Sequence, residues 1–467
     1  MGDVANILAY HYGQSDQTAK AAQYNAMAGI RSLGTYSLEE AERYLQKALA
    51  LLRCKDPSRL DSEVVRIIAA LAVVLWGRSK PKEVVALLER DLDRLWDRGD
   101  PEEISMVRYF YVISLLAKCR FSEAASVSDE ALRTAQASRN GRAIIYASAS
   151  AIWDSLHSKP MPLREFEHTA KAALAEAERS HDSLAVSILM FSIAWSYFLR
   201  GLTGAARHWA VRLLGFTRER DPRLVAVAHY ICGWLDILGR NYESAAREGE
   251  QCRRTAITPV DRLSGLQLSA SAKVLSGRVM EGIAEIEKVR SISLESDWPF
   301  MLLATDLAFG VGLLLNGEFN KGVRWLERAI CLCDKRYRNR PYADFTRISL
   351  AECYIELLRG NRRRVPAVPA RNILFLARLR LGAKRRAEVL LRTALQNELF
   401  SHNGIFAARI HLGLGTLDAL SGRRQLASLH LAHARSAALA QGEHVWLAKI
   451  DEISTSLEGG ARRQEAA

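Results

Sequence analysis

A recurring pattern with a period of about 40 residues most constrains the fold of this 467-residue chain. Each copy begins with a turn, often containing glycine, then a hydrophobic or aromatic residue, and then a small residue about three positions later. Four clear copies are RFSEAASVSDEAL (120–132), GLTGAARHWAVRL (201–213), RNYESAAREGEQC (240–252) and GEFNKGVRWLERA (317–329). Further apolar positions follow about four and seven residues later, which is the spacing of one helix face. The pattern therefore predicts a series of similar helical units.

Small residues are expected to hold the helices of each unit together. The anchoring positions are Ala41, Val84, Ala124, Ala206, Ala245, Gly282, Gly322 and Ala427. A second small residue stands about twelve positions before several anchors, at Gly29, Ala194, Gly233, Gly310 and Gly415. Small residues midway along two successive helices let the two backbones approach closely as an antiparallel pair.

This layout resembles the tetratricopeptide repeat, whose consensus has small residues at these two sites and an aromatic residue at the turn. The match is best over 181–219, 221–257 and 297–335. The resemblance implies an all-α fold, in which antiparallel helical hairpins stack into a right-handed solenoid with a concave inner face.

The composition favours a folded protein of the cytoplasm. Hydrophobic residues make up 49% of the chain, and only 11 residues are proline. The seven cysteines are scattered, which is typical of reduced thiols. Two apolar segments, 67–76 and 300–315, are expected to be buried repeat helices, because the first is too short to cross a bilayer and the second contains Asp306. We therefore expect no association with a membrane.

Motifs for catalysis are missing from the sequence. It has no GxxxxGK[ST] phosphate loop, no HExxH, no GxSxG and no strand-rich region. Cys331 and Cys333 would point to different sides of a helix. His411, His430 and His433 would lie close together, but no carboxylate or cysteine completes a zinc-binding spacing. The sequence therefore predicts a protein that is not an enzyme, with no metal site and no cofactor.

Large aromatic residues recur at matching positions in the first helix of several units. They are Tyr109, Trp153, Phe191, Trp195, Phe198, Tyr230 and Trp234. Equivalent positions on successive first helices line the concave face of a solenoid, so these residues are candidates for binding a peptide helix or a small ligand. The alternative is that they fill the gaps between adjacent hairpins.

The repeat pattern is interrupted by a strongly basic stretch. Residues 357–392 hold eleven basic residues against Glu388 alone, a net charge of +10 out of +13 for the chain. Pro366 and Pro369 interrupt the helix there. We expect a repeat array over 1–359, a basic linker over 360–370 and further hairpins over 371–467. The candidate patch comprises Arg362, Arg363, Arg364, Arg371, Arg378 and Arg385.

This patch has two interpretations, a docking site for an acidic protein surface and a solvated linker. Binding of nucleic acid is disfavoured, because Phe375 is the only aromatic residue available for stacking on bases.

Three segments carry a second resemblance: Ile7–Gly29, the pair Arg371-Asn372 followed by ILFLARLRL, and Gly404–Gly442. Together they resemble the C-terminal repeat region of bacterial class III adenylate or guanylate cyclases that also carry an ATPase module. ATP-dependent transcriptional regulators share this region. The resemblance implies a non-catalytic regulatory module of a signalling protein, with a protein partner such as an associated ATPase or cyclase. The alternative is a small-molecule-sensing repeat domain of a transcriptional regulator.

Neither the cyclase nor the ATPase domain of that family is found in the sequence. The resemblance therefore implies a free-standing repeat domain or a fragment, and it carries over no catalytic activity.

Overall fold

The computed structural model describes residues 4–54, 56–95, 100–158, 160–220, 224–360 and 370–465. The described residues form helices joined by short turns and contain no β-strand, which confirms the predicted all-α class. The helices are α1 (Ala5–Gly13), α2 (Thr18–Gly34), α3 (Leu38–Arg53), α4 (Ser62–Gly77), α5 (Pro81–Glu89), α6 (Leu92–Leu95), α7 (Pro101–Ala117), α8 (Phe121–Ser138), α9 (Gly141–Ser155), α10 (Leu163–Arg179), α11 (Ser183–Leu199), α12 (Thr203–Arg220), α13 (Val225–Leu238), α14 (Tyr242–Thr255), α15 (Pro259–Ser276), α16 (Val279–Glu295), α17 (Pro299–Leu315), α18 (Phe319–Cys331), the π-helical segment η3 (Leu332–Tyr337), α19 (Arg340–Arg359), α20 (Ala370–Leu395), α21 (Ile405–Ala419), α22 (Arg424–Ala440) and α23 (His444–Glu465).

Local sequence signals start many of these helices. Proline occupies the first turn of α5, α7, α15, α17 and α19, where a missing N–H costs no helical hydrogen bond. Side-chain caps accept a hydrogen bond from a backbone N–H of the first turn. The capping residues include Asp61, Asp100, Asn140, Asp182 and Thr258.

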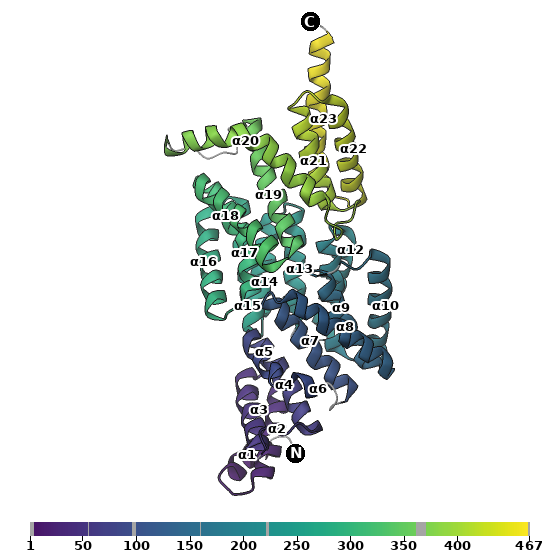
Figure 1. Cartoon of the computed structure of the whole chain (residues 1–467), viewed down its shortest axis with the longest axis vertical. Coiled ribbons are helices and arrows are strands. Elements are labelled where there is room, and N and C mark those ends of the chain that lie inside the picture. The colour runs from purple at the N-terminus through teal and green to yellow at the C-terminus, as the bar shows by residue number, and fades with distance from the viewer. Residues whose placement is uncertain are drawn as a thin grey trace.

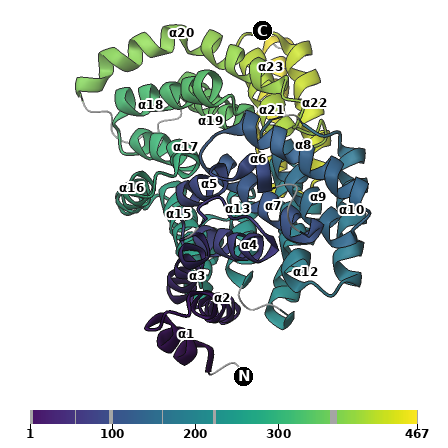
Figure 2. The ribbon, with the colours of Figure 1, turned by 60° about the horizontal axis from the view of Figure 1, so that its bottom comes forward.

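The helices are arranged in two rows. Most helices pack against their neighbour in the chain, as α2 does against α3, α13 against α14 and α21 against α22. In addition, the odd-numbered helices from α7 to α23 contact one another in order, so they form one continuous row. The even-numbered helices lie outside this row. Figure 2 shows α16 and α18 on one side of the molecule and α8, α10 and α12 on the other.

Glycine residues allow the closest helix contacts, as predicted. A Cβ atom added at Gly29 would lie 2.6 Å from Leu45 Cγ, and one added at Gly310 would lie 2.4 Å from Leu326 Cδ2. The Cβ position of Gly415 is 3.0 Å from Leu431 Cγ. Each of these pairs joins the two helices of one predicted hairpin.

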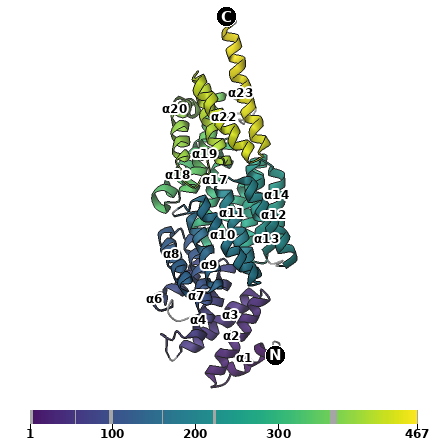
Figure 3. The same ribbon diagram turned by 90° about the vertical axis from the view of Figure 1, so that its right-hand side faces the viewer.

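Segments far apart in the sequence lie side by side. Lys118 Nζ donates to the Asp297 carbonyl oxygen at 2.9 Å, across 179 residues of chain. Trp446 Nε1 donates to the Leu238 carbonyl oxygen at 3.0 Å, across 208 residues. In a third contact of this kind, the Ile405 N–H donates to the Gly201 carbonyl oxygen at 2.8 Å. Distant segments are thus adjacent in the fold, while α1 and α23 lie at opposite ends of the long axis (Figures 1 and 3).

None of the helices in the described ranges is both long enough and apolar enough to span a membrane. The two apolar segments of the sequence lie in α4 and α17, where most of their side chains are buried. α19 ends at Arg359 and α20 begins at Ala370. Residues 361–369 lie outside the described residues, and the division into an array, a linker and C-terminal hairpins stays a prediction.

Candidate ligand-binding cavity

The aromatic residues singled out in the sequence form a connected group on the inner row. Phe191, Trp195 and Phe198 of α11 follow one another, with ring centroids 5.9 Å and 4.9 Å apart. The Trp195 ring stacks on Tyr230 of α13 at 5.7 Å, and Tyr230 meets Trp234 edge-on at 6.2 Å. The equivalent positions of α11 and α13 are therefore in direct contact.

The same group extends towards the amino terminus. Trp153 of α9 lies 5.7 Å from Phe191, and Tyr109 of α7 lies 6.2 Å from Tyr146, between ring centroids. Burial raises the pKa of the Tyr109 and Tyr230 hydroxyls, so both stay protonated. The structure thus places all seven predicted aromatic residues along four successive helices of the inner row.

These residues line two neighbouring cavities. The larger, of about 510 Å³, lies mainly among the odd-numbered helices from α11 to α23, and residues of α14, α18 and α20 also line it. The smaller, of about 290 Å³, lies among helices between α2 and α19. Trp195, Tyr230 and Tyr342 line both cavities and form the wall between them. We call the larger one the inner cavity.

Polar groups are few in the aromatic part of the inner-cavity wall. The Tyr230 hydroxyl donates to Gln267 Oε1 at 2.9 Å, and Gln267 Nε2 donates to the Ala304 carbonyl oxygen at 3.1 Å. Gln267 is fully buried, so its amide is held in place by these two bonds. In this aromatic region the Tyr230 hydroxyl and the Gln267 amide are therefore paired, whereas the buried Trp234 Nε1 has no hydrogen-bond partner.

One end of the inner cavity is charged. Arg409 of α21 donates to both oxygens of Glu352 of α19, at 2.9 Å each. Burial alone would raise the pKa of the Glu352 carboxyl. The nearby charges of Arg409, Lys449 and Arg240 outweigh burial and hold that pKa below its ordinary value. Glu352 therefore stays ionised.

Trp446 of α23 lies at the centre of this charged end. Its ring centroid is 5.3 Å from Arg409 Cζ, 4.7 Å from Lys449 Nζ and 5.6 Å from Arg240 Cζ. Cations at such distances from a tryptophan face are attracted by its π-electrons. Trp446 is 4% exposed and is fixed by its hydrogen bond to Leu238.

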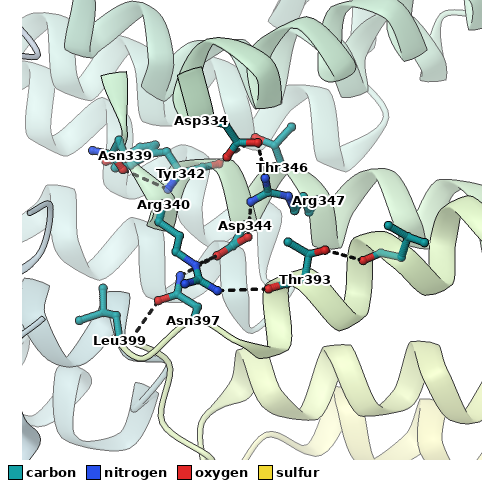
Figure 4. A network of polar contacts seen from close by, with 11 residues as sticks. Asp334, Asn339, Arg340, Tyr342, Asp344, Thr346, Arg347, Thr393, Asn397 and Leu399 are labelled. Carbon is teal, nitrogen blue, oxygen red and sulfur yellow. Dashed lines mark hydrogen bonds and ion pairs between the residues drawn. The ribbon is translucent and has the colours of Figure 1, made fainter. Parts of the chain in front are cut away.

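A polar network fixes the helix that bears Tyr342 and Thr346 of the cavity wall (Figure 4). Asp344 of α19 has a fully buried side chain, which is paired with Arg347 and accepts a hydrogen bond from Asn397 Nδ2 at 2.8 Å. Arg347 also pairs with Asp334 of η3. The network thus joins η3 and α19 to the segment that follows α20.

Two of the six residues of the predicted basic patch, Arg378 and Arg385, are fully described in the structure. Arg362, Arg363 and Arg364 lie outside the described residues, and so does the side chain of Arg371 in α20. Arg378 and Arg385 are exposed on α20. Figure 1 shows the first half of this helix extending away from the body of the protein. The structure therefore leaves open both interpretations of the patch.

The histidines near the C-terminus do come together. His411 Nδ1 lies 2.9 Å from His430 Nδ1, and the rings of His411 and His433 are 5.0 Å apart. Burial lowers the pKa of His411 to about 4. Within the described ranges, no three histidine, cysteine or acidic side chains are arranged to hold a metal ion. Cys331 is exposed, whereas Cys333 is buried.

The charged end of the inner cavity was not predicted from the sequence. Glu352, Arg409, Trp446 and Lys449 come from three different helices that meet only in the folded chain. One residue could have indicated this end of the cavity from the sequence. It is Trp446, an isolated large aromatic residue in the segment HVWLAKIDEI. Neither family models nor curated proteins give any match to this chain. The two resemblances described above therefore stay expectations.

Proposed function

We propose that this chain is a non-catalytic regulatory module whose interior binds a small, largely apolar molecule. The observation that supports this proposal is the inner cavity of about 510 Å³, with Trp195, Tyr230 and Trp234 in its wall. Ligand pockets in proteins typically measure about 300–1,000 Å³ and have apolar walls with a few polar groups. As the cyclase resemblance implies, the module would regulate an associated signalling ATPase or cyclase.

The proposed architecture is a right-handed solenoid of tetratricopeptide-like hairpins. The inner row of odd-numbered helices would be its concave layer. Contacts across 179 to 208 residues support a solenoid that coils until one turn rests on the next. In such a closed coil, the concave face becomes an interior rather than an open groove.

Burial of the aromatic group favours a small molecule over a peptide helix. Trp195 and Phe198 are each 6% exposed. A peptide helix would have to separate the coil turns to reach them, whereas a small molecule needs only the space that the cavity already has. This favours the alternative that the module senses a small molecule.

Binding of N-phenyl-1-naphthylamine, an uncharged probe that fluoresces in apolar surroundings, tests the proposal. Ser349 of α19 lines the inner cavity and is half-buried, so Ser349→Trp would fill part of the space. The matched control is Ser122→Trp, because Ser122 is exposed on α8. We expect saturable binding to the wild type and to Ser122→Trp, and weaker binding to Ser349→Trp.

Two results would contradict the proposal. One is the absence of saturable binding to the wild type. The other is equal binding to both tryptophan variants, which would place the probe outside the inner cavity. Thermal unfolding of each variant, followed by circular dichroism, checks that the fold is intact.

Docking of a protein partner on α20 is a second candidate function. Through this helix the module would contact the protein that it regulates. Leu381 of this helix is 90% exposed and is surrounded in sequence by exposed Arg378, Arg380 and Arg385. The positive charges of this helix would attract an acidic partner surface, because complementary charges steer association. Leu376 and Leu379 of the same helix line the inner cavity. α20 would therefore connect the bound small molecule to the docked partner.

A further inference from the structure

We infer that the smaller cavity is a second binding site, which takes a small organic ammonium ion, and that Asp261 is the counter-ion of this ligand. The inference goes beyond the proposed function, because it concerns a different cavity and does not require a ligand in the inner one. It is carried by one carboxylate in a wall of mainly aromatic and apolar side chains.

Negative charge in the wall of the smaller cavity comes from a single residue. Among the described residues that line it, Asp261 of α15 is the one carboxylate, and there is no lysine or arginine. His157 also lines the cavity, but burial lowers the pKa of its imidazole to about 3, so the ring is neutral at pH 7. With Asp261 ionised, the wall therefore has a charge of −1 and no cation of its own to balance it.

The protein uses only part of the Asp261 carboxyl group. Thr258 Oγ1 donates to Asp261 Oδ2 at 2.6 Å and accepts from the Asp261 N–H at 3.1 Å, as part of the cap of α15. The side chain of Asp261 is half-buried, and in the described part of the chain no cation forms an ion pair with it. Burial raises the pKa of this carboxyl to about 6, so it is still ionised at pH 7.4. One carboxylate oxygen, Oδ1, is thus left for a ligand.

Arg262 is the cation whose charge acts on Asp261. It lies outside the wall of the smaller cavity, where it is exposed and donates to the Ile257 carbonyl oxygen at 3.0 Å. A cation that enters the cavity would therefore approach Asp261 from the aromatic side without displacing Arg262.

Aromatic rings provide the second half of an ammonium site. Trp76 of α4 and Trp298, which directly precedes α17, line the smaller cavity with ring centroids 5.9 Å apart and planes inclined by 66°. Trp153 and Trp195 line it from α9 and α11. Ammonium ions are attracted to the faces of tryptophan rings, and cages of aromatic rings recognise quaternary ammonium groups in this way.

The class of cation follows from the ligands that the cavity offers. Within the described ranges, no three histidine, cysteine or acidic side chains are arranged to hold a metal ion. A metal ion would therefore have one carboxylate and otherwise apolar surroundings. An organic ammonium ion has apolar surface that the rings can cover, and its charge is balanced by Asp261. The cavity of about 290 Å³ has room for a small molecule of this kind.

Isothermal titration calorimetry with a matched pair of probes tests the inference. Choline carries a permanent trimethylammonium charge, and 3,3-dimethyl-1-butanol has the same shape with carbon in place of the charged nitrogen. We expect the wild type to bind choline at least tenfold more tightly than the uncharged probe, since a counter-ion attracts a charge more strongly in a protein interior than in water. Equal affinity for the two probes, or no binding of choline, would overturn the inference.

Removal of the carboxylate charge should abolish this preference. Asp261→Asn keeps an oxygen for the Thr258 hydroxyl, so the cap of α15 is retained. We expect this variant to bind choline at least tenfold more weakly and the uncharged probe unchanged. The matched control is Asp129→Asn, which makes the same change of charge at an exposed position of α8 and should bind choline like the wild type. An equal loss in both variants would overturn the role of Asp261.

Two measurements place the bound cation and do not require Asp261→Asn to fold. Ser349→Trp, which fills part of the inner cavity, should leave choline affinity unchanged; a loss would place choline in the inner cavity and overturn the inference. In the wild type, lowering the pH from 7.4 to 5 should weaken choline binding about tenfold, because Asp261 is protonated with a pKa of about 6 while His157 stays neutral. Choline affinity that is the same at both pH values would contradict the assignment of Asp261 as counter-ion.

Discussion

The contact between α14 and α15 gives the sharpest test of the helix packing. Gly249 of α14 and Gly265 of α15 face each other, and no flexible side chain separates them. A Cβ atom added at Gly249 would lie 2.7 Å from the Ser269 backbone nitrogen and 3.0 Å from the Gly265 carbonyl oxygen. Gly249→Ala must therefore push two helix backbones apart.

The magnitude follows from two opposing terms. Forcing an extra carbon into a closely packed contact costs about 1–3 kcal/mol. Replacing glycine by alanine within a helix returns about 1 kcal/mol. Gly215 of α12 is the matched control, because a Cβ atom added there has no neighbour within 4 Å and gains only the second term. We expect the free energy of unfolding of Gly249→Ala to be about 1–3 kcal/mol below that of Gly215→Ala.

Urea denaturation followed by far-ultraviolet circular dichroism measures this difference, and hydrogen exchange with mass spectrometry locates it. Because α14 and α15 pack mainly against each other and against α13 and α16, faster exchange should be concentrated in α13–α16 in Gly249→Ala. Equal stabilisation by the two substitutions would refute the reasoning. It would show that the close contact of α14 and α15 does not limit the packing.

Three further predictions concern pH, charge and catalysis. Burial lowers the pKa of His157 from 6.5 to about 3, so the unfolded chain binds a proton that the folded chain rejects, and stability falls as the pH drops below 6.5. The free energy of unfolding should fall by about 2 kcal/mol at pH 5 through this group. Urea denaturation of His157→Phe should not show this fall, because the variant has no imidazole to protonate. A difference in stability between wild type and variant that does not depend on pH would contradict the prediction. Charge reversal at Arg362, Arg363 and Arg364 should slow association with an acidic partner and weaken its salt dependence, measured by surface plasmon resonance; unchanged kinetics would favour the solvated linker. Purified protein with ATP or GTP and a divalent metal should release neither cyclic nucleotide nor phosphate, and turnover that co-elutes with the protein on a sizing column would disprove this.

Local regularities made the fold class predictable. The helical spacing of small and apolar residues indicates helices without any knowledge of distant contacts. Gly29 and Gly310 were assigned to helix contacts from their position in the repeat alone, and both meet the expected partner helix. Trp195 and Trp234 were related in the same way, and they lie on α11 and α13 around one cavity.

The charged end of the cavity was not predictable, because it depends on how far the chain coils. A repeat pattern determines how neighbouring units pack, whereas small rotations per unit add up to determine which distant helices meet. In the proposed solenoid, the meeting of Trp446 with Leu238 across 208 residues would be such an accumulated result. The basic stretch was visible from composition, but composition does not determine where α20 lies relative to the cavity.

A crystal structure of the protein soaked with N-phenyl-1-naphthylamine tests the central claim most directly. The account predicts electron density for the probe inside the inner cavity, beside Trp195, Trp234 and Phe345. Density only on the outer surface of the helices, with the inner cavity empty at a saturating concentration of the probe, would contradict it.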